Sequence, residues 1–257
     1  MLPSLFISHG SPLLCLMNHE ARDFLKQLPN SFKKPKYILV VSAHWLTNEL
    51  RILANPTPSK INDFYGFPRE LYELEYKASN DLTKVDEIVN LFDSKNIEII
   101  KDDKRDGYDH GVWAPLSLMY QDADIPVIQI SLPLHAQTKD LLKIGEVLQD
   151  LREDTLIIAS GTMTHNLSQL NSDVDAKVTK YSKVFRDWIV EKIQNADISN
   201  MENFKEKAPY LSENHPSLDH FLPLIIALGA SKSKKGEALN SIYMYGNMAM
   251  DTIVFKD

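Results

Sequence analysis

Hydrophobic positions along the chain form short unbroken apolar runs that alternate with longer amphipathic stretches. Several runs contain Ile, Val, Leu, Phe and Tyr without polar alternation, which is typical of strands covered on both faces. The runs predict strands over Ser4–Ser8, Tyr37–Ala43, Leu50–Leu53, Ile97–Ile100, Val127–Leu132, Leu156–Ser160, Ser241–Tyr245 and Thr252–Phe255. The amphipathic stretches predict helices over Glu20–Leu28, Leu82–Ser94, Thr138–Leu151, Ala176–Ile193 and Leu218–Leu228.

This order of elements predicts an α/β fold. Strands that alternate with helices form a mostly parallel or mixed central sheet with helices on both faces, a three-layer α/β/α sandwich. A length of 257 residues suits one large domain or two small ones, and no linker rich in Pro, Gly or Ser divides the chain. We therefore expect a single domain over residues 1–257.

Composition and charge exclude several classes of protein. The fractions of hydrophobic (44%) and charged (25%) residues are those of a globular protein, and the net charge of -7 argues against a nucleic-acid partner. No apolar run approaches the roughly 20 residues that a membrane helix needs, and no basic segment of a signal peptide opens the chain. The single cysteine, Cys15, excludes an intrachain disulfide, so we expect a cytoplasmic protein.

Histidines lie where the predicted strands end. His9 and His44 come directly after the first two predicted strands, and His165 follows the strand Leu156–Ser160. The carboxyl ends of parallel strands meet at one edge of a sheet, where ligands bind in open α/β folds. We therefore expect these three side chains to converge.

Two more histidines neighbour turns or a helix start. His110 precedes Gly111 in a turn-rich segment, and His220 lies near the start of the last predicted helix. One buried histidine is commonly a core residue, but five in such positions indicate a site, and imidazoles without cysteine suit Zn, Fe, Cu or Ni. The motifs H-E-x-x-H, G-x-S-x-G, G-x-G-x-x-G and the P-loop are all absent, which argues against zincin proteases, serine hydrolases, dinucleotide enzymes and P-loop nucleotidases.

At these residues the sequence resembles the DODA-type extradiol aromatic-ring-opening dioxygenases of the LigB-like superfamily. The similar segments occur in the family's order and span most of the chain. They are His9-Gly10-Ser11-Pro12, Val41-Ser42-Ala43-His44-Trp45, Asp63-Phe64-Tyr65-Gly66-Phe67-Pro68, Tyr108-Asp109-His110-Gly111-Val112-Trp113, Ala159-Ser160-Gly161 with His165-Asn166-Leu167, and Asp219-His220-Phe221-Leu222-Pro223-Leu224. The family's α/β sandwich agrees with the fold that the pattern predicts.

The resemblance implies one divalent non-haem metal, Fe(II) for dioxygenase activity, although zinc also suits such a site. It implies that His9, His44 and His220 hold the metal. His165 would be a catalytic base or a fourth ligand, and His110 would contact the substrate and assist proton transfer. Asp219 precedes His220, and neighbours on a helix point about 100° apart, so only one of the two is expected to face the metal.

The function that follows from the resemblance is the opening of a catechol-type ring by O2, as in a DOPA dioxygenase. The expected partners are a small catechol-type substrate and O2, with neither nucleic acid nor membrane. The loop Asn55–Pro68 contains three prolines and three aromatic rings, and we expect it to cover the metal pocket. Core packing is the alternative role of the rings that we expect to wall the substrate slot, Trp45, Phe64, Tyr65, Phe67 and Trp113.

Two other functions use the same residues. A zinc hydrolase would use the same histidine ligands and an activated water, and it would need a glutamate general base near the site. Glu70 and Glu213 lie near the motif segments in sequence, but the segments themselves contain no glutamate. A non-enzymatic binding protein on the same fold is the second alternative, because fold does not fix function.

Overall fold

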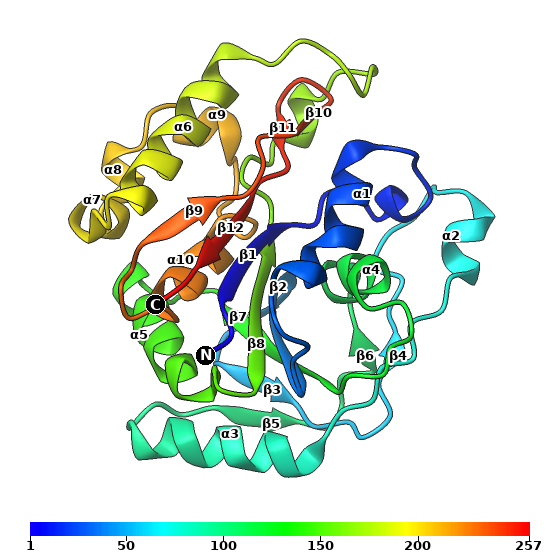
Figure 1. Ribbon diagram of the computed structural model, residues 1–257, viewed down its shortest axis with the longest axis vertical. Coiled ribbons are helices and arrows are strands. Elements are labelled where there is room, and N and C mark those ends of the chain that lie inside the picture. Colours follow the sequence, from blue (N-terminus) through cyan, green and yellow to red (C-terminus); the bar gives the residue numbers. More distant parts are fainter.

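The computed structural model describes residues 1–257 and has an eight-stranded mixed sheet at its centre (Figure 1). Neighbouring strands in the series β7, β2, β8 and β1 are parallel. At one edge β12 is antiparallel to both of its neighbours, β1 and β9, and on the other side β3 is antiparallel to β7. In spatial order the strands are β5 (Ile100–Asp102), β3 (Arg51–Leu53), β7 (Val127–Pro133), β2 (Tyr37–Thr47), β8 (Thr155–Gly161), β1 (Ser4–Ser8), β12 (Thr252–Phe255) and β9 (Gly236–Ala238).

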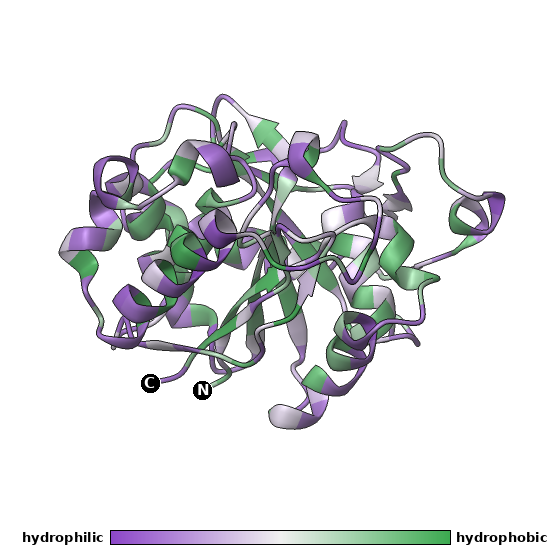
Figure 2. Cartoon of the chain, turned by 90° about the horizontal axis from the view of Figure 1, so that it is seen from above, coloured by the Kyte–Doolittle hydropathy of each residue, from purple (hydrophilic) through white to green (hydrophobic).

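Helices cover both faces of this sheet, as Figures 1 and 2 show. Side chains of α3, α5, α6 and α10 form one apolar cluster with the sheet, and side chains of α1 and α4 form the other. The helices are α1 (Glu20–Gln27), α2 (Arg69–Glu73), α3 (Leu82–Ser94), α4 (His110–Met119), α5 (Thr138–Leu148), α6 (Lys180–Gln194), α7 (Ile198–Glu202), α8 (Phe204–Lys207), α9 (Leu211–Asn214) and α10 (Leu222–Gly229). The predicted three-layer α/β architecture is confirmed.

Double coverage explains the apolar runs in the sequence. Every residue of β1, β7 and β8 is buried, so these strands have no solvent-facing side that would select alternating polar residues. Two small sheets lie outside the main one and carry loops near the carboxyl ends of its strands. They pair β4 (Ser59–Lys60) with β6 (Gly107–Tyr108), and β10 (Tyr243–Met244) with β11 (Met248–Ala249).

The structure differs from the predicted elements in several places. The strand predicted over Ile97–Ile100 is β5 at Ile100–Asp102, β9 was not predicted, and the helices predicted from Ala176 and Leu218 begin at Lys180 and Leu222. Strand β2 continues past Ala43 to Thr47, and the predicted strand Ser241–Tyr245 contributes only the short β10, outside the main sheet. Helix α4 was not predicted, because Gly111 and Pro115 lie inside it and both residues disfavour helix. No helix of this fold combines the length and the apolar character that crossing a membrane requires.

Arg152 ties the two ends of the chain to the sheet. Its side chain is only 1% exposed, and its guanidinium donates hydrogen bonds to the carbonyl oxygens of Leu2 (2.8 Å), Ala230 (2.7 Å) and Phe255 (3.3 Å). It also pairs with the Asp257 carboxylate at 2.6 Å. One buried cation therefore holds both chain termini and the residue that follows α10.

We predict that Arg152→Met lowers the free energy of unfolding by about 3–5 kcal/mol, because it leaves a partly buried carboxylate and three carbonyls without their donor. The matched control is Lys34→Met, which breaks the exposed pair with Asp124 and is expected to cost at most about 1 kcal/mol. Urea unfolding of both variants measures the difference. Equal losses would contradict the role assigned to Arg152.

Candidate metal centre

The predicted convergence of strand-end histidines occurs at the carboxyl ends of β1, β8 and β2. These strands are adjacent and parallel, so His9, just after β1, and His165, four residues after β8, lie at the same edge. His44 lies inside β2, at a point where the pairing with β7 shifts register between Val41 and Leu46. Such a bulge bends the strand locally and redirects side chains, which here brings the His44 ring to the edge.

His220 reaches the same edge because the backbone before α10 lies directly against the end of β8. The Thr162 N–H donates to the His220 carbonyl at 3.0 Å. A Cβ on Gly161 would lie 2.1 Å from that carbonyl oxygen, so only glycine permits this approach. The small residue at the end of β8 thus positions a histidine that lies 59 residues later in the sequence.

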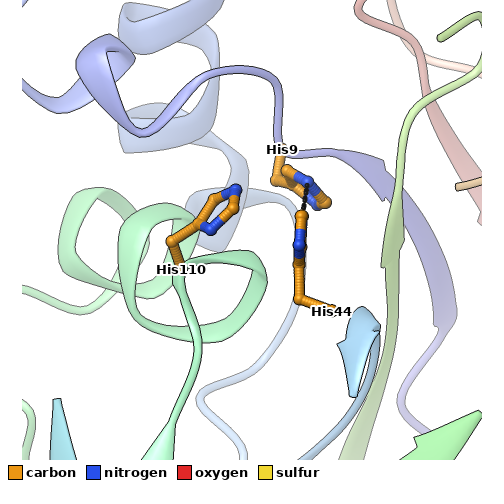
Figure 3. Close-up of side chains that lie close together, drawn as sticks. All are labelled: His9, His44 and His110. Carbon is orange, nitrogen blue, oxygen red and sulfur yellow. Dashed lines mark hydrogen bonds between the residues drawn. The ribbon is translucent and has the colours of Figure 1, made fainter. Parts of the chain in front are cut away.

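The Nε2 atoms of three histidines meet. His9 Nε2 lies 3.1 Å from His44 Nε2, which lies 3.2 Å from His220 Nε2. Two nitrogens bound to one ion at about 2.1 Å are about 3.0–3.4 Å apart, so these spacings fit ligands of one metal. Figure 3 shows that the His110 ring also faces His9 and His44, and ring nitrogens of these three lie within 4.8 Å of one another.

A hydrogen bond on the side of the ring that faces away from the other histidines fixes the tautomer of His9. Its Nδ1 lies 2.9 Å from Ser160 Oγ, and that hydroxyl donates its only proton to the Gly111 carbonyl at 2.5 Å. The carbonyl is free for this bond because Pro115, four residues on in α4, has no N–H. Ser160 must therefore accept from His9 Nδ1–H, which leaves an unprotonated Nε2 facing the other rings.

A carboxylate fixes His220 in the same way. Asp219 Oδ2 lies 2.5 Å from His220 Nδ1. Burial alone would raise the pKa of the Asp219 carboxyl, but hydrogen bonds from His220 and Ser217 lower it. The ionised carboxylate only accepts, so His220 carries its proton on Nδ1 and presents the lone pair of Nε2. This pairing of a carboxylate behind an imidazole is typical of metal-ligating histidines.

Burial and neighbouring imidazoles keep His9 and His44 neutral. They lower the pKa of His44 to about 2 and the pKa of His9 well below its ordinary value. His44 can donate at most one proton from Nε2, so at least one of its two short Nε2 contacts has no hydrogen bond between the nitrogens. A cation between the three nitrogens would accept the lone pairs of all three, and neutral imidazoles suit a divalent transition metal or zinc.

Asp63 is a site residue that the sequence reasoning missed. Its Oδ1 lies 2.9 Å from His110 Nδ1 and accepts the His110 backbone N–H at 3.1 Å, while its Oδ2 lies 3.6 Å from His44 Nδ1. One carboxylate from the loop Asn55–Pro68 thus orients two histidines. The sequence signal that could have identified Asp63 is its place at the start of the Asp63–Pro68 motif, to which only the aromatic rings had drawn attention.

Asp109 holds His110 at the first position of α4. Its buried carboxylate caps the helix by accepting the Gly111 N–H at 3.0 Å, and it also accepts from Ser42 Oγ at 2.5 Å. Arg105 and Gln129 complete its hydrogen bonds at 2.8 and 2.6 Å. Because Ser42 belongs to the bulged part of β2, Asp109 links the backbone that carries His44 to the helix that carries His110.

His165 stacks face to face on His220. The ring centroids are 3.5 Å apart and the planes differ by 7°. Burial lowers the pKa of His165 to about 3, with a further contribution from His220, so the ring is neutral near pH 7.

A cavity of about 450 Å³ opens in front of these histidines. Phe64 and Phe67 from the loop Asn55–Pro68 form part of its wall, with their rings 5.2 Å apart. The lining residues are His9, Gly10, Ser11, Pro12, Leu13, His44, Phe64, Phe67, His110, His165, Leu167, Leu170, His220, Tyr245 and Met248. The four apolar residues outside the motifs, Leu13, Leu170, Tyr245 and Met248, gave no chemical signal in the sequence.

Three predicted substrate-wall residues do not reach this cavity. Trp113 is fully buried and donates from Nε1 to the Ile61 carbonyl at 3.0 Å, and Trp45 is buried beneath the Arg105 guanidinium. Tyr65 is 93% exposed, because the chain turns at Gly66 with a positive φ of 79° and directs the ring into solvent. The two tryptophans therefore have the packing role, and the substrate wall from this loop consists of Phe64 and Phe67.

Comparison with known proteins agrees with the resemblance. A family model described as the catalytic LigB subunit of aromatic ring-opening dioxygenase matches residues 3–255. The chain belongs to this family. It is 33% identical over 255 residues to a 4,5-DOPA dioxygenase extradiol of Beta vulgaris, covering 97% of this chain and 95% of that one.

Two further LigB-family comparisons come from one bacterium. The chain is 31% identical over 233 residues to a 4,5-DOPA dioxygenase extradiol of Escherichia coli K12, covering 89% and 85% of the two chains. A crystal structure of an uncharacterised Escherichia coli K12 protein superposes with a TM-score of 0.80 at 25% identity and covers 100% of both chains. Family membership and the fold class are therefore confirmed together.

Proposed function

We propose that this LigB-family protein is an extradiol dioxygenase that opens a catechol-type ring with O2, using one divalent metal held by His9, His44 and His220. The observation that carries the proposal is the convergence of three Nε2 atoms, two of them left unprotonated by the partners of Nδ1. The family and the 4,5-DOPA dioxygenase relatives support ring opening as the reaction. When bound, Fe(II) supplies the electron sharing with O2 that zinc lacks.

The third ligand is His220 in preference to His110. The Nε2 of His220 lies 3.2 Å from that of His44, and Asp219 holds its Nδ1 from behind. His110 also has a carboxylate, Asp63, at its Nδ1, but its ring makes no contact of hydrogen-bond length with the nitrogens of His9 or His44, with which it groups only within 4.8 Å. We assign His110, oriented by Asp63, to hydrogen bonding with the substrate and to proton transfer.

Stacking argues against His165 as a fourth ligand. A ligated metal lies in the plane of the imidazole that binds it, and the parallel planes of His165 and His220 are separated by a full stacking distance. A metal held by His220 would therefore not be bound by the stacked His165 ring as well. We assign His165 to accepting a proton from a catechol hydroxyl, because it lines the cavity beside the ligand set.

The cavity wall supports an aromatic substrate. Phe64 lies 5.8 Å from the His110 ring in an edge-to-face arrangement, and with Phe67 it forms an apolar surface on which a planar ring packs. This wall also excludes water from the groups that move protons. A zinc hydrolase is less favoured, because no aspartate or glutamate is among the lining residues to act as a general base.

Metal content separates the ligands from the proton-transfer groups. We expect His9→Ala, His44→Ala and His220→Ala to lose most bound metal after dialysis, because each removes one of three ligands. His110→Ala and His165→Gln serve as matched controls and are expected to retain it. Elemental analysis of the dialysed proteins measures this. Loss of metal in His110→Ala with retention in His220→Ala would contradict the assignment.

Metal identity tests the reaction class. In the experiment, a catechol is added to Fe(II)-loaded protein without oxygen, and the mixture is then exposed to O2. We expect O2 to be consumed, because ring opening needs a metal that shares electrons with O2. Zinc-loaded protein is expected to consume none, since Zn²⁺ has no accessible redox state. An oxygen electrode and the absorbance of the opened ring measure both. Equal turnover by the two forms would contradict the dioxygenase proposal.

Removing the His165 imidazole is expected to slow turnover without releasing the metal. General acid–base help contributes a factor of about 10²–10⁴, so His165→Gln should lower kcat by that range. His135→Gln, which makes the same substitution at an exposed histidine outside the cavity, is the control and should retain kcat within about threefold. A normal kcat in His165→Gln would exclude His165 as the base.

A further inference from the structure

Apart from histidine, the wall of the catalytic cavity contains none of the residue types that carry a charge. None of its fifteen lining residues is Lys, Arg, Asp or Glu. A charged group that leaves water must find an opposite charge or several hydrogen bonds, or its binding is penalised. The lining thus discriminates between catechols by the charge of their substituent.

Two carboxylates lie close to the cavity. The Asp63 and Asp219 carboxylates lie directly behind the histidines, at His110 and at His220. The whole chain carries a net charge of -7, so its long-range field also disfavours an anion. The proposed metal is occupied by the two catechol oxygens, so a substituent carboxylate would find no cationic side chain among the lining residues.

The wall of the cavity is apolar up to its mouth. Leu13, Leu167 and Leu170 line it, and Leu167 is 59% exposed although it belongs to the site. Exposed apolar side chains that continue a cavity wall mark a surface that a ligand covers. The volume of about 450 Å³ lies in the range of small-molecule sites and leaves room for a substituent beside one ring.

Given the proposed function, we infer that the substrate is a catechol whose ring substituent is uncharged and apolar, and that Leu13, Leu167 and Leu170 bind this substituent. Such a substrate differs from DOPA, the amino acid in the names of the relatives, because DOPA carries a carboxylate and an ammonium group. Leu167 is a specificity-determining residue, because it lies where a substituent leaves the cavity for solvent.

The test compares catechols with similar three-carbon or two-carbon chains and different charge: 4-propylcatechol, 3-(3,4-dihydroxyphenyl)propionate, dopamine and DOPA. Oxygen uptake by Fe(II)-loaded protein gives kcat/KM, and anaerobic calorimetry with zinc-loaded protein gives Kd. We expect 4-propylcatechol to have a kcat/KM at least about tenfold higher and a Kd at least about tenfold lower than each charged analogue, because only the neutral chain loses no hydration of a charge.

A substitution at the mouth should reverse the preference. Leu167→Arg introduces a positive charge at an exposed position. We expect it to raise the ratio of kcat/KM for the propionate to kcat/KM for 4-propylcatechol by about tenfold or more. Leu134→Arg is the matched control: Leu134 is 50% exposed and lies outside the cavity. The control adds the same net charge and should leave the ratio unchanged.

The outcomes separate this inference from the proposed function. Propionate or DOPA that is bound and cleaved as well as 4-propylcatechol would overturn the inference and leave the dioxygenase function standing. If fully metal-loaded protein cleaves none of the four, the proposed function fails, and the calorimetric ranking then decides the inference. An equal change of the ratio in Leu167→Arg and Leu134→Arg would overturn the role of Leu167.

Discussion

The direction of three imidazole lone pairs is the constraint on which the site depends. His44 Nε2 can donate to only one of the two nitrogens that face it at 3.1 and 3.2 Å, so the three rings cannot satisfy one another. Ser160 and Asp219 accept hydrogen bonds from Nδ1–H on the far sides of His9 and His220, which directs the Nε2 atoms of both rings toward His44. The fold therefore commits hydrogen bonds to an arrangement that suits the binding of a metal ion.

The backbone delivers these rings through local exceptions to regular structure. A bulge in β2 redirects His44, and Gly161 lets the segment of His220 lie against β8. Pro115 interrupts the hydrogen bonding of α4, and the carbonyl it frees accepts the hydroxyl of Ser160. Each exception would weaken its element in isolation, and each is offset by the buried sheet that supports the edge.

The sequence was sufficient to predict the features that depend on hydrophobic periodicity and on the ends of the strands. The apolar runs located the central strands, and parallel strand ends predicted the meeting of His9, His44 and His165. Helix α4 was missed because its Gly and Pro disfavour helix in isolation, while tertiary packing and the Asp109 cap hold it. Which aromatic rings face the cavity depends on the turn at Gly66 and on packing across the sheet, neither of which a linear pattern contains.

X-ray absorption at the iron edge of anaerobic Fe(II)-loaded protein tests the central claim most directly. The account predicts three imidazole nitrogens at about 2.0–2.2 Å, with the remaining positions filled by oxygen from water or substrate. It also predicts two imidazoles in any His220→Ala protein that is loaded by excess metal, and three in His110→Ala and His165→Gln. Three imidazoles in His220→Ala, or two in His110→Ala, would contradict it.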